Sequence, residues 1–488
     1  MNHGGDFRGP LQLDQQRRPG ARARGRLLLN LLPFSRRRPD LFPMVSRPIL
    51  IVPLILASLG AFSASVAAQQ LKEKSHVERF SSPEVRAERD EATATANLGT
   101  NASDDQALNA RALARMRLGR YKEAYDDLRR AVSIKPANSD YQANLGYVLW
   151  KLGQPDEAIA AERAALKLNP KNTTAHYQLG RFLLRMGEQR NLAEAVAELR
   201  KALELDPRQY EVRFELIAAY RELGSLAEAA AQLDVLQDAR PTDPRVFYVT
   251  ALLDTDRNDL NSAVKNFNEA INRDPSLSAA WQDLGIAYMK ANRWSEAVTA
   301  FAELARRQPN SVEAAYFHAL ALYNSDKNVE AEAEVRRALR LDAGAVEAHT
   351  LLGIILASRG NANTEAVDAL SQAIALNPNS FDAQFYLGRV QYAMKDYAGA
   401  VKSFRAALKI NPQHAEAHFF LGTTLELAGD SNAAMTEYQE LLKSNSNSVM
   451  GQLGLGALLV KQGKLDEAES HLARETIAPR SARILARD

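Results

Sequence analysis

Small and large apolar residues recur with a period of 34 residues, from residue 105 to about residue 480. If each unit is numbered from 1, large residues occupy positions 4, 7, 11 and 24, and small residues occupy positions 8, 20 and 27. This spacing predicts two helices in each unit, packed closely through the small residues. The units begin at residues 105, 139, 173, 210, 244, 278, 312, 346, 381, 415 and 449.

Position 20 is alanine in all eleven units, from Ala124 in the first to Ala468 in the last. Position 8 is glycine in seven units, alanine in three and isoleucine in one. The sixth unit combines Gly285 at position 8 with Ala297 at position 20. We expect leucine at either residue to overpack the helix interface, at a cost of about 1–3 kcal/mol.

Turn-forming residues mark the ends of both helices. Position 15 is Gly, Asn or Asp in ten units and Lys395 in the ninth. Gly, Asn and Asp tolerate the left-handed conformation in which helices commonly end. Position 32 is proline in eight units, which ends the second helix. Two units are longer, by three residues around 188–190 and by one near 361–363, and we expect both insertions to lie in turns.

These residues resemble the tetratricopeptide repeat, whose pattern contains Trp, Leu-Gly, Tyr, Ala, Phe, Ala and Pro. The resemblance covers residues 105 to about 478. It implies an all-α fold, a superhelical solenoid of antiparallel helix pairs whose first helices line a concave groove. The sixth unit matches most fully, through Trp281, Leu284, Gly285, Tyr288, Ala297, Phe301 and Pro309, with Leu304 as the one departure.

Positions 2, 5, 9 and 12 of the first helix share one face, which is the candidate binding surface. Aromatic residues and arginines are frequent on this face, and both supply a large contact area for an extended peptide or a partner helix. The aromatic residues at position 5 have an alternative role, which is packing against the first helix of the next unit. The candidate residues are Tyr147, Trp150, Tyr177, Arg181, Phe214, Arg221, Tyr248, Tyr316, Tyr323, Phe385, Arg389, Tyr392 and Phe419.

Two specialised forms of the family are not matched. Repeats that clamp a terminal carboxylate carry Lys at position 5 and Asn at position 9 of one unit, and neither occurs at these positions here. Repeats of the O-linked N-acetylglucosamine transferase carry an asparagine ladder at position 6. Here Asn144 is followed by Gln178, Glu215, Val249 and Asp283, so the ladder is not continuous.

Composition limits the chemistry further. The chain has no cysteine, which excludes thiol nucleophiles, disulfides and cysteine-ligated metal sites. Its net charge of +2 is unevenly distributed, since residues 1–68 carry ten arginines and three aspartates while the rest has 51 basic and 56 acidic residues. The mildly acidic net charge of residues 69–488 does not favour nucleic-acid binding.

The start of the chain has the pattern of an export signal. An uncharged run at residues 48–68 follows Arg47 and ends in small residues. We therefore predict a signal peptide at residues 44–68, initiated at Met44 and cleaved after Ala68. Under this hypothesis translation starts at Met44, and the basic, Arg/Pro-rich residues 1–43 were assigned to the protein in error. The alternative is a retained signal anchor, because 21 uncharged residues can span a bilayer.

Two further segments flank the repeats. Residues 69–104 are polar and charge-dense, and we expect a linker or a weak leading cap. The repeats are assigned to residues 105–480 and a C-terminal tail to residues 481–488.

Signals for catalysis are weak. His414 and His418 have a spacing that metal sites use, but they fall in a predicted connector and at a packing position. Gly454 and Gly456 imitate half of a dinucleotide-binding motif, but they lie inside a predicted first helix and are interpreted as packing glycines. We therefore expect no enzyme activity, no cofactor and no metal.

The expected function is that of an exported scaffold, periplasmic or secreted, which binds proteins or peptides through its aromatic groove. Assembly of a bacterial envelope complex, such as a pilus, a secretion machine or a polysaccharide exporter, is suggested by analogy within the family. One alternative is a membrane-anchored assembly factor with its repeats outside the cytoplasm. Another is a non-catalytic accessory or regulatory subunit of a glycan-modifying enzyme.

Overall fold

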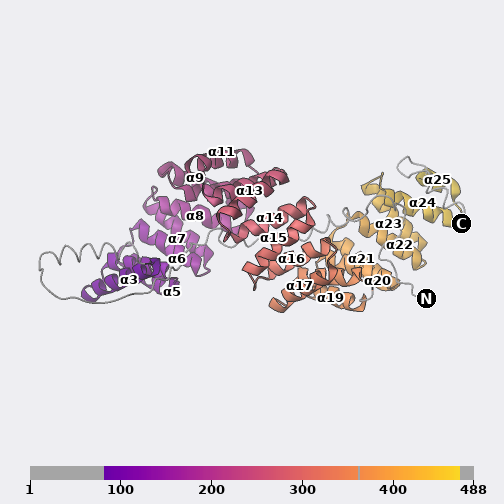
Figure 1. Ribbon diagram of the computed structural model, residues 1–488, viewed down its shortest axis with the longest axis horizontal. Coiled ribbons are helices and arrows are strands. Elements are labelled where there is room, and N and C mark those ends of the chain that lie inside the picture. The colour runs from indigo at the N-terminus through magenta and orange to yellow at the C-terminus, as the bar shows by residue number, and fades with distance from the viewer. Residues whose placement is uncertain (1–81, 361–362, 473–488) are drawn as a thin grey trace. The chain divides into compact units, whose positions relative to one another are not determined.

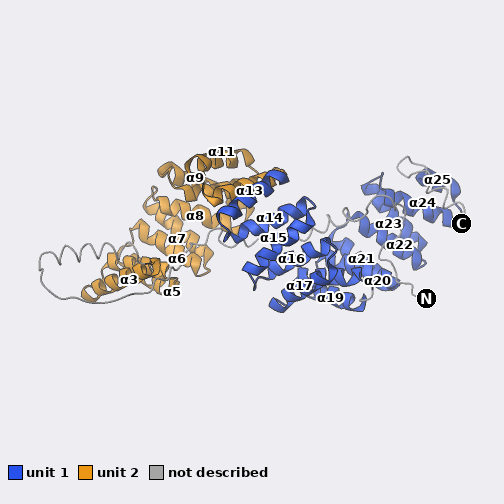
Figure 2. Ribbon diagram, in the orientation of Figure 1, with its two compact units in different colours: residues 1–35, 260–488 blue, residues 36–259 orange. Residues whose placement is uncertain are grey.

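The computed structural model describes residues 82–472 except 361–362, and its only regular secondary structure in these residues is α-helix (Figure 1). The chain divides into two compact units, residues 36–259 and residues 1–35 with 260–488 (Figure 2). We call the described portions, residues 82–259 and 260–472, the N-terminal block and the C-terminal block. The predicted signal segment and C-terminal tail lie outside the described residues.

The N-terminal block holds a leading helix and the first four and a half repeats. The leading helix is α3 (Pro83–Thr100). The first helices of the repeats are α4 (Asp105–Arg117), α6 (Ser139–Lys151), α8 (Thr173–Met186), α10 (Tyr210–Glu222) and α12 (Pro244–Asp256). The second helices are α5 (Tyr121–Ile134), α7 (Pro155–Leu168), α9 (Gln189–Leu205) and α11 (Leu226–Ala239).

The C-terminal block begins with the second helix of the fifth repeat, α13 (Leu260–Arg273). Its first helices are α14 (Ser278–Lys290), α16 (Val312–Asn324), α18 (Val346–Ser358), α20 (Phe381–Ala393), α22 (Ala415–Leu427) and α24 (Val449–Lys461). Its other second helices are α15 (Trp294–Arg307), α17 (Asn328–Leu341), α19 (Asn363–Leu376), α21 (Tyr397–Ile410), α23 (Ser431–Ser444) and α25 (Leu465–Leu472). In both blocks a first helix begins at each residue that starts a 34-residue unit in the sequence.

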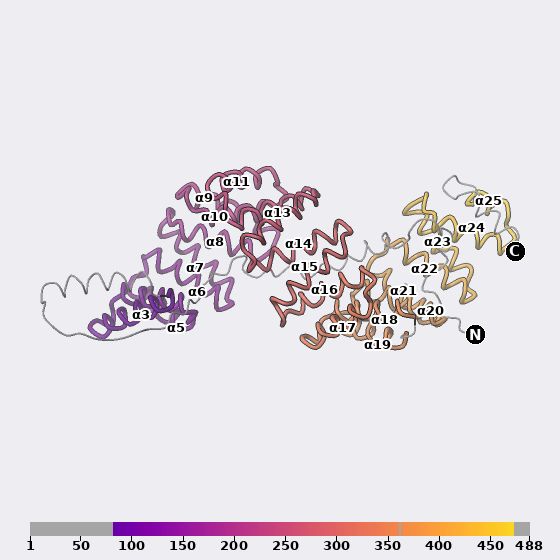
Figure 3. Tube along the Cα trace, viewed as in Figure 1, coloured from indigo at the N-terminus to yellow at the C-terminus, as the bar shows by residue number. Residues whose placement is uncertain are grey.

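The antiparallel path of each helix pair can be followed in Figure 3. Within each block, a second helix packs against the first helix of its own repeat and that of the next. The small residues lie at these contacts, and all eleven alanines of position 20 are buried. A Cβ atom on Gly285 would lie 2.5 Å from Cζ of Phe301, so only glycine allows this approach. The packing predicted from positions 8, 20 and 24 is therefore confirmed in the sixth repeat.

The turn between the helices of each repeat uses the left-handed conformation. All eleven residues at position 15 have positive φ, and Lys395 adopts φ 62° although it carries a side chain. The next residue closes the turn, as where the N–H of Asp396 donates to the C=O of Gln391 at 2.9 Å. The predicted turn chemistry therefore holds even where the residue type is unfavourable.

The three-residue insertion does not lie in a turn, so this expectation was wrong. Gly187 ends α8 with φ 67°, and α9 starts at Gln189 and has 17 residues where α7 has 14. The extra residues add to the first turn of α9, where the Glu188 carboxylate accepts a hydrogen bond from Arg190 Nε at 2.7 Å. Added helical residues continue the backbone hydrogen bonding of a helix that is already packed. The one-residue insertion falls largely on residues 361–362, outside the described part.

Part of the segment predicted to be a polar linker or weak cap is helical. Helix α3 buries Ala87 and Ala94. Its Glu91 forms an ion pair with Arg115 of α4 at 2.9 Å, and Asp90 forms one with Arg117 at 2.7 Å. Helix α3 is therefore attached to the first repeat by small apolar contacts and ion pairs, as expected for a leading cap. Among the described residues, no helix has the length and apolar character needed to cross a bilayer.

Candidate partner-binding surface

The first helices form a connected row within each block. In the N-terminal block, consecutive first helices from α4 to α12 contact one another, and in the C-terminal block those from α16 to α24 do so. The second helices make most of their contacts with first helices. The first helices are therefore the closely spaced, inner row of each stack, where a curved repeat protein presents its binding surface.

The structure divides the thirteen predicted residues into two groups. Five side chains are buried and contribute to helix packing: Phe214, Tyr248, Tyr316, Tyr323 and Phe385. Four of these five occupy position 5, where packing against the neighbouring repeat was the alternative role. The other eight are half-buried: Tyr147, Trp150, Tyr177, Arg181, Arg221, Arg389, Tyr392 and Phe419. Contact of any of the thirteen with a partner stays a prediction.

One group of half-buried residues lies on α6 and α8 around the buried ring of Phe182. We call it the Arg181 cluster: Tyr147, Trp150, Tyr177, Arg181 and Phe182. The Arg181 guanidinium lies 5.7 Å from the ring centroid of Tyr147, 5.4 Å from that of Tyr177 and 5.7 Å from that of Phe182. Trp150 and Phe182 stack with ring centroids 4.4 Å apart. Guanidinium groups are attracted to aromatic faces at such distances. The rings thus hold Arg181 in one place between two repeats.

A buried carboxyl group lies in the core of the same two repeats. Glu162 of α7 is fully buried, and neither of its carboxyl oxygens has a hydrogen-bond partner. Burial raises its pKa well above the usual carboxyl range, although the positive charge of Arg181 opposes the shift. Burial therefore favours the protonated, neutral form of this carboxyl group.

Glu162 occupies position 24, where every other repeat has Leu, Phe, Tyr or Val. A Cβ atom on Gly146 would lie 2.6 Å from Oε1 of Glu162, so the carboxyl group fills the site that an aromatic ring fills in the sixth repeat. Glu162 was not among the residues predicted from the sequence. The single charged residue in an otherwise apolar column was the signal that would have found it.

Position 24 faces position 6 of the next repeat. Phe301 stacks on Phe317 at a centroid distance of 5.3 Å, and Phe404 stacks on Phe420 at 5.9 Å. The corresponding pair in the second and third repeats is Glu162 and Gln178, and Oε1 of the buried Gln178 also lacks a hydrogen-bond partner. One polar pair therefore replaces an aromatic stack beneath the Arg181 cluster.

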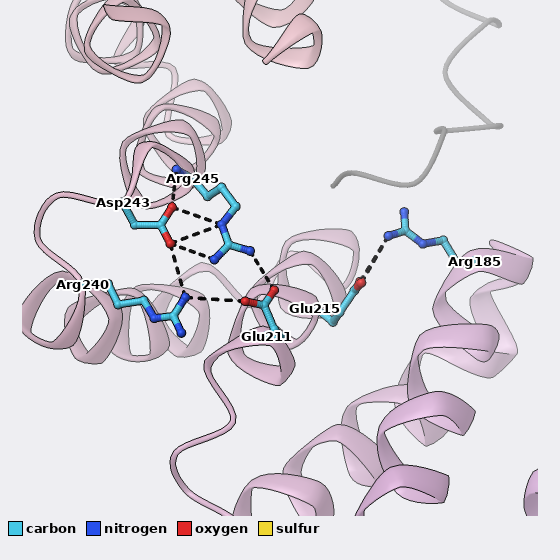
Figure 4. Close-up of polar contacts among 6 residues, drawn as sticks. All are labelled: Arg185, Glu211, Glu215, Arg240, Asp243 and Arg245. Carbon is cyan, nitrogen blue, oxygen red and sulfur yellow. Dashed lines mark hydrogen bonds and ion pairs between the residues drawn. The ribbon is translucent and has the colours of Figure 1, made fainter. Parts of the chain in front are cut away.

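Other arginines of the N-terminal block pair with carboxylates (Figure 4). Arg245 contacts Asp243 at 2.8 Å and Glu211 at 2.8 Å, and Arg240 lies 3.5 Å from Asp243. Although burial of Asp243 opposes the shift, the hydrogen bonds from Arg245 hold its pKa below the usual range. This network joins the connector before α12 to α10.

Two further first-helix arginines also have acidic partners. Arg185 of α8 lies 3.3 Å from Glu215 of α10, and both are drawn in Figure 4. Arg221, one of the predicted surface residues, forms an ion pair with Asp256 in which Nη2 and Oδ1 are 3.0 Å apart. Arg181 differs, because no ion pair among the described residues includes it.

A second group lies on α20 and α22, and we call it the Arg389 cluster: Phe385, Tyr386, Arg389, Tyr392 and Phe420. The Arg389 guanidinium lies 5.1 Å from the ring centroid of Phe420 and 5.7 Å from that of Tyr386. Tyr392 packs edge-on to Phe420 at 6.1 Å. Phe420 and Tyr386 occupy position 6, which the prediction did not include. On α20, burial raises the pKa of Asp382 to about 6.

The residues considered for metal or nucleotide chemistry have structural contacts. His414 accepts a hydrogen bond from the N–H of Ala417 as the N-cap of α22, and His418 hydrogen-bonds to Glu437 at 2.7 Å. Within the described residues, no group of three acidic or histidine side chains is placed to hold a metal ion. Added Cβ atoms on Gly454 and Gly456 would lie 2.5 Å from Tyr438 and 2.6 Å from Leu472, which agrees with packing glycines.

Stacked antiparallel helix pairs, small residues at the contacts and a connected inner row define an α-helical repeat solenoid. Family models described as tetratricopeptide repeat match residues 143–188, 188–253 and 248–482 in overlapping segments, and a model described as TPR repeat matches residues 112–153. These matches cover well over half of the chain. The chain belongs to the tetratricopeptide repeat family, as its sequence pattern predicted.

Solved structures with a similar fold include the Cut9–Hcn1 hetero-tetramer of the APC/C, with 14% identity, a TM-score of 0.43 and coverage of 81% of this chain and 95% of that chain. Yeast Tom70 is 14% identical, with a TM-score of 0.39 and coverage of 79% and 92%. MamA is 23% identical, with a TM-score of 0.31 and coverage of 35% and 92%. A search of curated protein sequences found no match.

Proposed function

We propose that this protein is a non-enzymatic scaffold that binds a partner protein or peptide along the inner row of first helices. Tetratricopeptide repeats generally mediate protein–protein interaction, and the chain carries them over most of its length. The observation that carries the proposal is the Arg181 cluster, where half-buried rings from two repeats surround one guanidinium group.

The cluster has the composition of an interface anchor. Aromatic and arginine side chains dominate the binding energy of many interfaces, because each offers a large surface for few rotatable bonds. Packing on Tyr147, Tyr177 and Phe182 already restricts Arg181, so little side-chain entropy remains to be lost on binding. The half-buried members of the Arg389 cluster offer a comparable surface in the C-terminal block.

The proposal is tested by affinity purification from envelope extract with three forms of the full-length protein as bait. The first is the wild type, and the second carries Tyr147→Ala and Tyr177→Ala. The third carries Glu157→Ala and Lys167→Ala, which change exposed residues of the second helix α7. We expect a defined set of proteins that the first and third baits retain and the second loses. Identical sets from all three baits would contradict binding through the inner row.

We further propose that the protein is exported and acts in the assembly of an envelope complex. The pattern of residues 44–68 supports export, and the absence of cysteine is compatible with any redox compartment. The mature protein is then expected to begin at Gln69, which intact mass measurement of the purified protein would show. Recovery of peptides from residues 1–43 in the intact protein would argue against initiation at Met44. Protein that resists carbonate extraction from membranes would argue against cleavage.

A further inference from the structure

The charge of Arg181 is not compensated by a neighbouring carboxylate in the described part of the chain. Arg185, Arg221 and Arg245 all lie in the same block and all pair with aspartate or glutamate. Arg181 instead lies against ring faces, at 5.4–5.7 Å, and its side chain hydrogen-bonds to the uncharged hydroxyl group of Tyr177. Ring faces attract a guanidinium group but do not occupy its N–H donors in the way that a carboxylate does.

Two carboxyl groups lie within electrostatic reach of Arg181, and neither neutralises it. Glu162 is buried, and desolvation raises its pKa, which favours the uncharged form of its carboxyl group. Glu215 is held by Arg185 at 3.3 Å. Lys151 lies on the same surface, with its Nζ 5.7 Å from the Tyr147 ring that also contacts Arg181.

We propose that Arg181 anchors a side-chain carboxylate in an acidic, extended segment of the partner protein. This inference rests on the proposed function and names the chemistry of the partner at that surface. The guanidinium group offers a bidentate contact to one carboxylate, which is the strongest hydrogen-bonding geometry available to arginine. Ring surface lies on α6, through Tyr147 and Trp150, and on α8, through Tyr177, so a partner chain continues on both sides of the anchored residue.

The test uses the full-length protein and three labelled peptides of about 12 residues, long enough when extended to cross two first helices. The first peptide alternates glutamate with leucine and alanine and has an amidated C-terminus. The second replaces each glutamate by glutamine, and the third is the glutamine peptide with a free C-terminal carboxylate. Affinities are measured by fluorescence anisotropy.

We expect the glutamate peptide to bind the wild type roughly tenfold more tightly than the glutamine peptide. The reason is that the glutamine peptide has no charged carboxylate to accept hydrogen bonds from a guanidinium group. Arg181→Gln is expected to reduce this ratio to about one, and Arg181→Lys to an intermediate value, since lysine keeps the charge without the planar fork. The matched control is Arg163→Gln on the second helix α7, where Arg163 pairs with Glu194 at 2.8 Å, and it should leave the ratio unchanged.

Several results would overturn the inference. These are equal affinities of the wild type for the glutamate and glutamine peptides, a ratio that Arg181→Gln does not alter, tighter binding of the third peptide alone, or no binding of any peptide. None of these results would contradict the proposed function, which the affinity purification tests separately. Loss of partners from the Tyr147/Tyr177 variant does not depend on carboxylate recognition. A helical content and melting temperature equal to those of the wild type would show that the Arg181 variants are folded.

Discussion

Glu162 places two unsatisfied oxygens in the core between the second and third repeats. A buried polar group without a hydrogen bond costs about 1–3 kcal/mol relative to an apolar residue of similar size. Glu162 lies next to the Arg181 cluster, and burial favours the neutral form of its carboxyl group, which does not compensate the arginine charge. The residue is therefore unfavourable for stability and consistent with a binding role for its neighbour.

The stability of the protein should depend on pH through Glu162. In the unfolded chain this carboxyl group ionises in its ordinary range, whereas in the folded protein its pKa is much higher. The folded state therefore binds more protons between these two pKa values, and the stabilisation present at low pH is lost as the pH rises through this window.

The comparison that isolates this effect is the wild type against Glu162→Gln, which cannot ionise. The free energy of unfolding of the wild type relative to this variant should decrease as the pH rises from about 4 to 7. Glu162→Leu should be more stable than the wild type at pH 7 by roughly 1–3 kcal/mol. Urea unfolding at several pH values measures both quantities, and parallel pH profiles for the wild type and Glu162→Gln would contradict a buried, titrating carboxyl group.

Gly285 makes the second prediction at the scale of one residue. Replacing it by alanine should lower the free energy of unfolding by about 1–3 kcal/mol, because the new Cβ would lie 2.5 Å from the buried ring of Phe301. Gly99 in α3 is the matched control, since a Cβ there meets no atom within 4 Å. Gly99→Ala should be neutral or slightly stabilising through helix propensity. Equal effects of the two substitutions on urea unfolding would show that the close helix approach does not limit residue size.

At the scale of the element, the turn of the ninth repeat is strained by its side chain. Lys395 holds φ 62°, a conformation in which a Cβ atom crowds the following carbonyl oxygen. Lys395→Gly should therefore raise the free energy of unfolding by about 1 kcal/mol. Gly429→Ala, at the same position of the next repeat with φ 88°, should lower it by a similar amount. Thermal and urea unfolding would show opposite signs for these two variants, and the same sign for both would contradict the shared turn geometry.

Helices and turns were predictable from the sequence because each depends on local chemistry repeated eleven times. The exception was the insertion near residues 188–190, which lengthens α9 instead of the turn. Comparing the lengths of the repeats locates an insertion along the chain, but it does not show whether the added residues extend a helix or a turn. Helix α3 shows the same limit, since its polar sequence predicts either a linker or a cap and only its contacts with Arg115 and Arg117 distinguish the two.

At the scale of the whole molecule, the fold was predictable and the surface only in part. A period shared by eleven units specifies helix pairs that must stack on one another. Exposure differs among the aromatic residues of position 5, since Tyr177 is half-buried whereas Tyr248 is buried. The pairing state of each arginine also depends on residues about 35 positions away, as for Arg221 and Asp256. The exposure of an aromatic residue and the ion pairing of an arginine therefore cannot be predicted from the sequence of one repeat.

The two blocks each carry an aromatic cluster around an arginine, the Arg181 cluster and the Arg389 cluster. The two clusters differ in what lies beneath them, since Phe404 and Phe420 stack in the C-terminal block where the N-terminal block has Glu162 and Gln178. We therefore expect carboxylate recognition to belong to the N-terminal block. Substitutions in the Arg389 cluster should alter the affinity for apolar partner residues without changing the preference for acidic ones.

The most direct test of the central claim is site-specific photocrosslinking in intact cells. The photoreactive residue p-benzoylphenylalanine replaces Tyr147 or Tyr177 on the inner row, or Glu157 on the exposed side of α7 as the control. We expect covalent adducts of a defined mass from both inner-row sites and none of that mass from residue 157. Adducts that form from residue 157 alone, or equally from all three sites, would contradict a partner bound along the first helices.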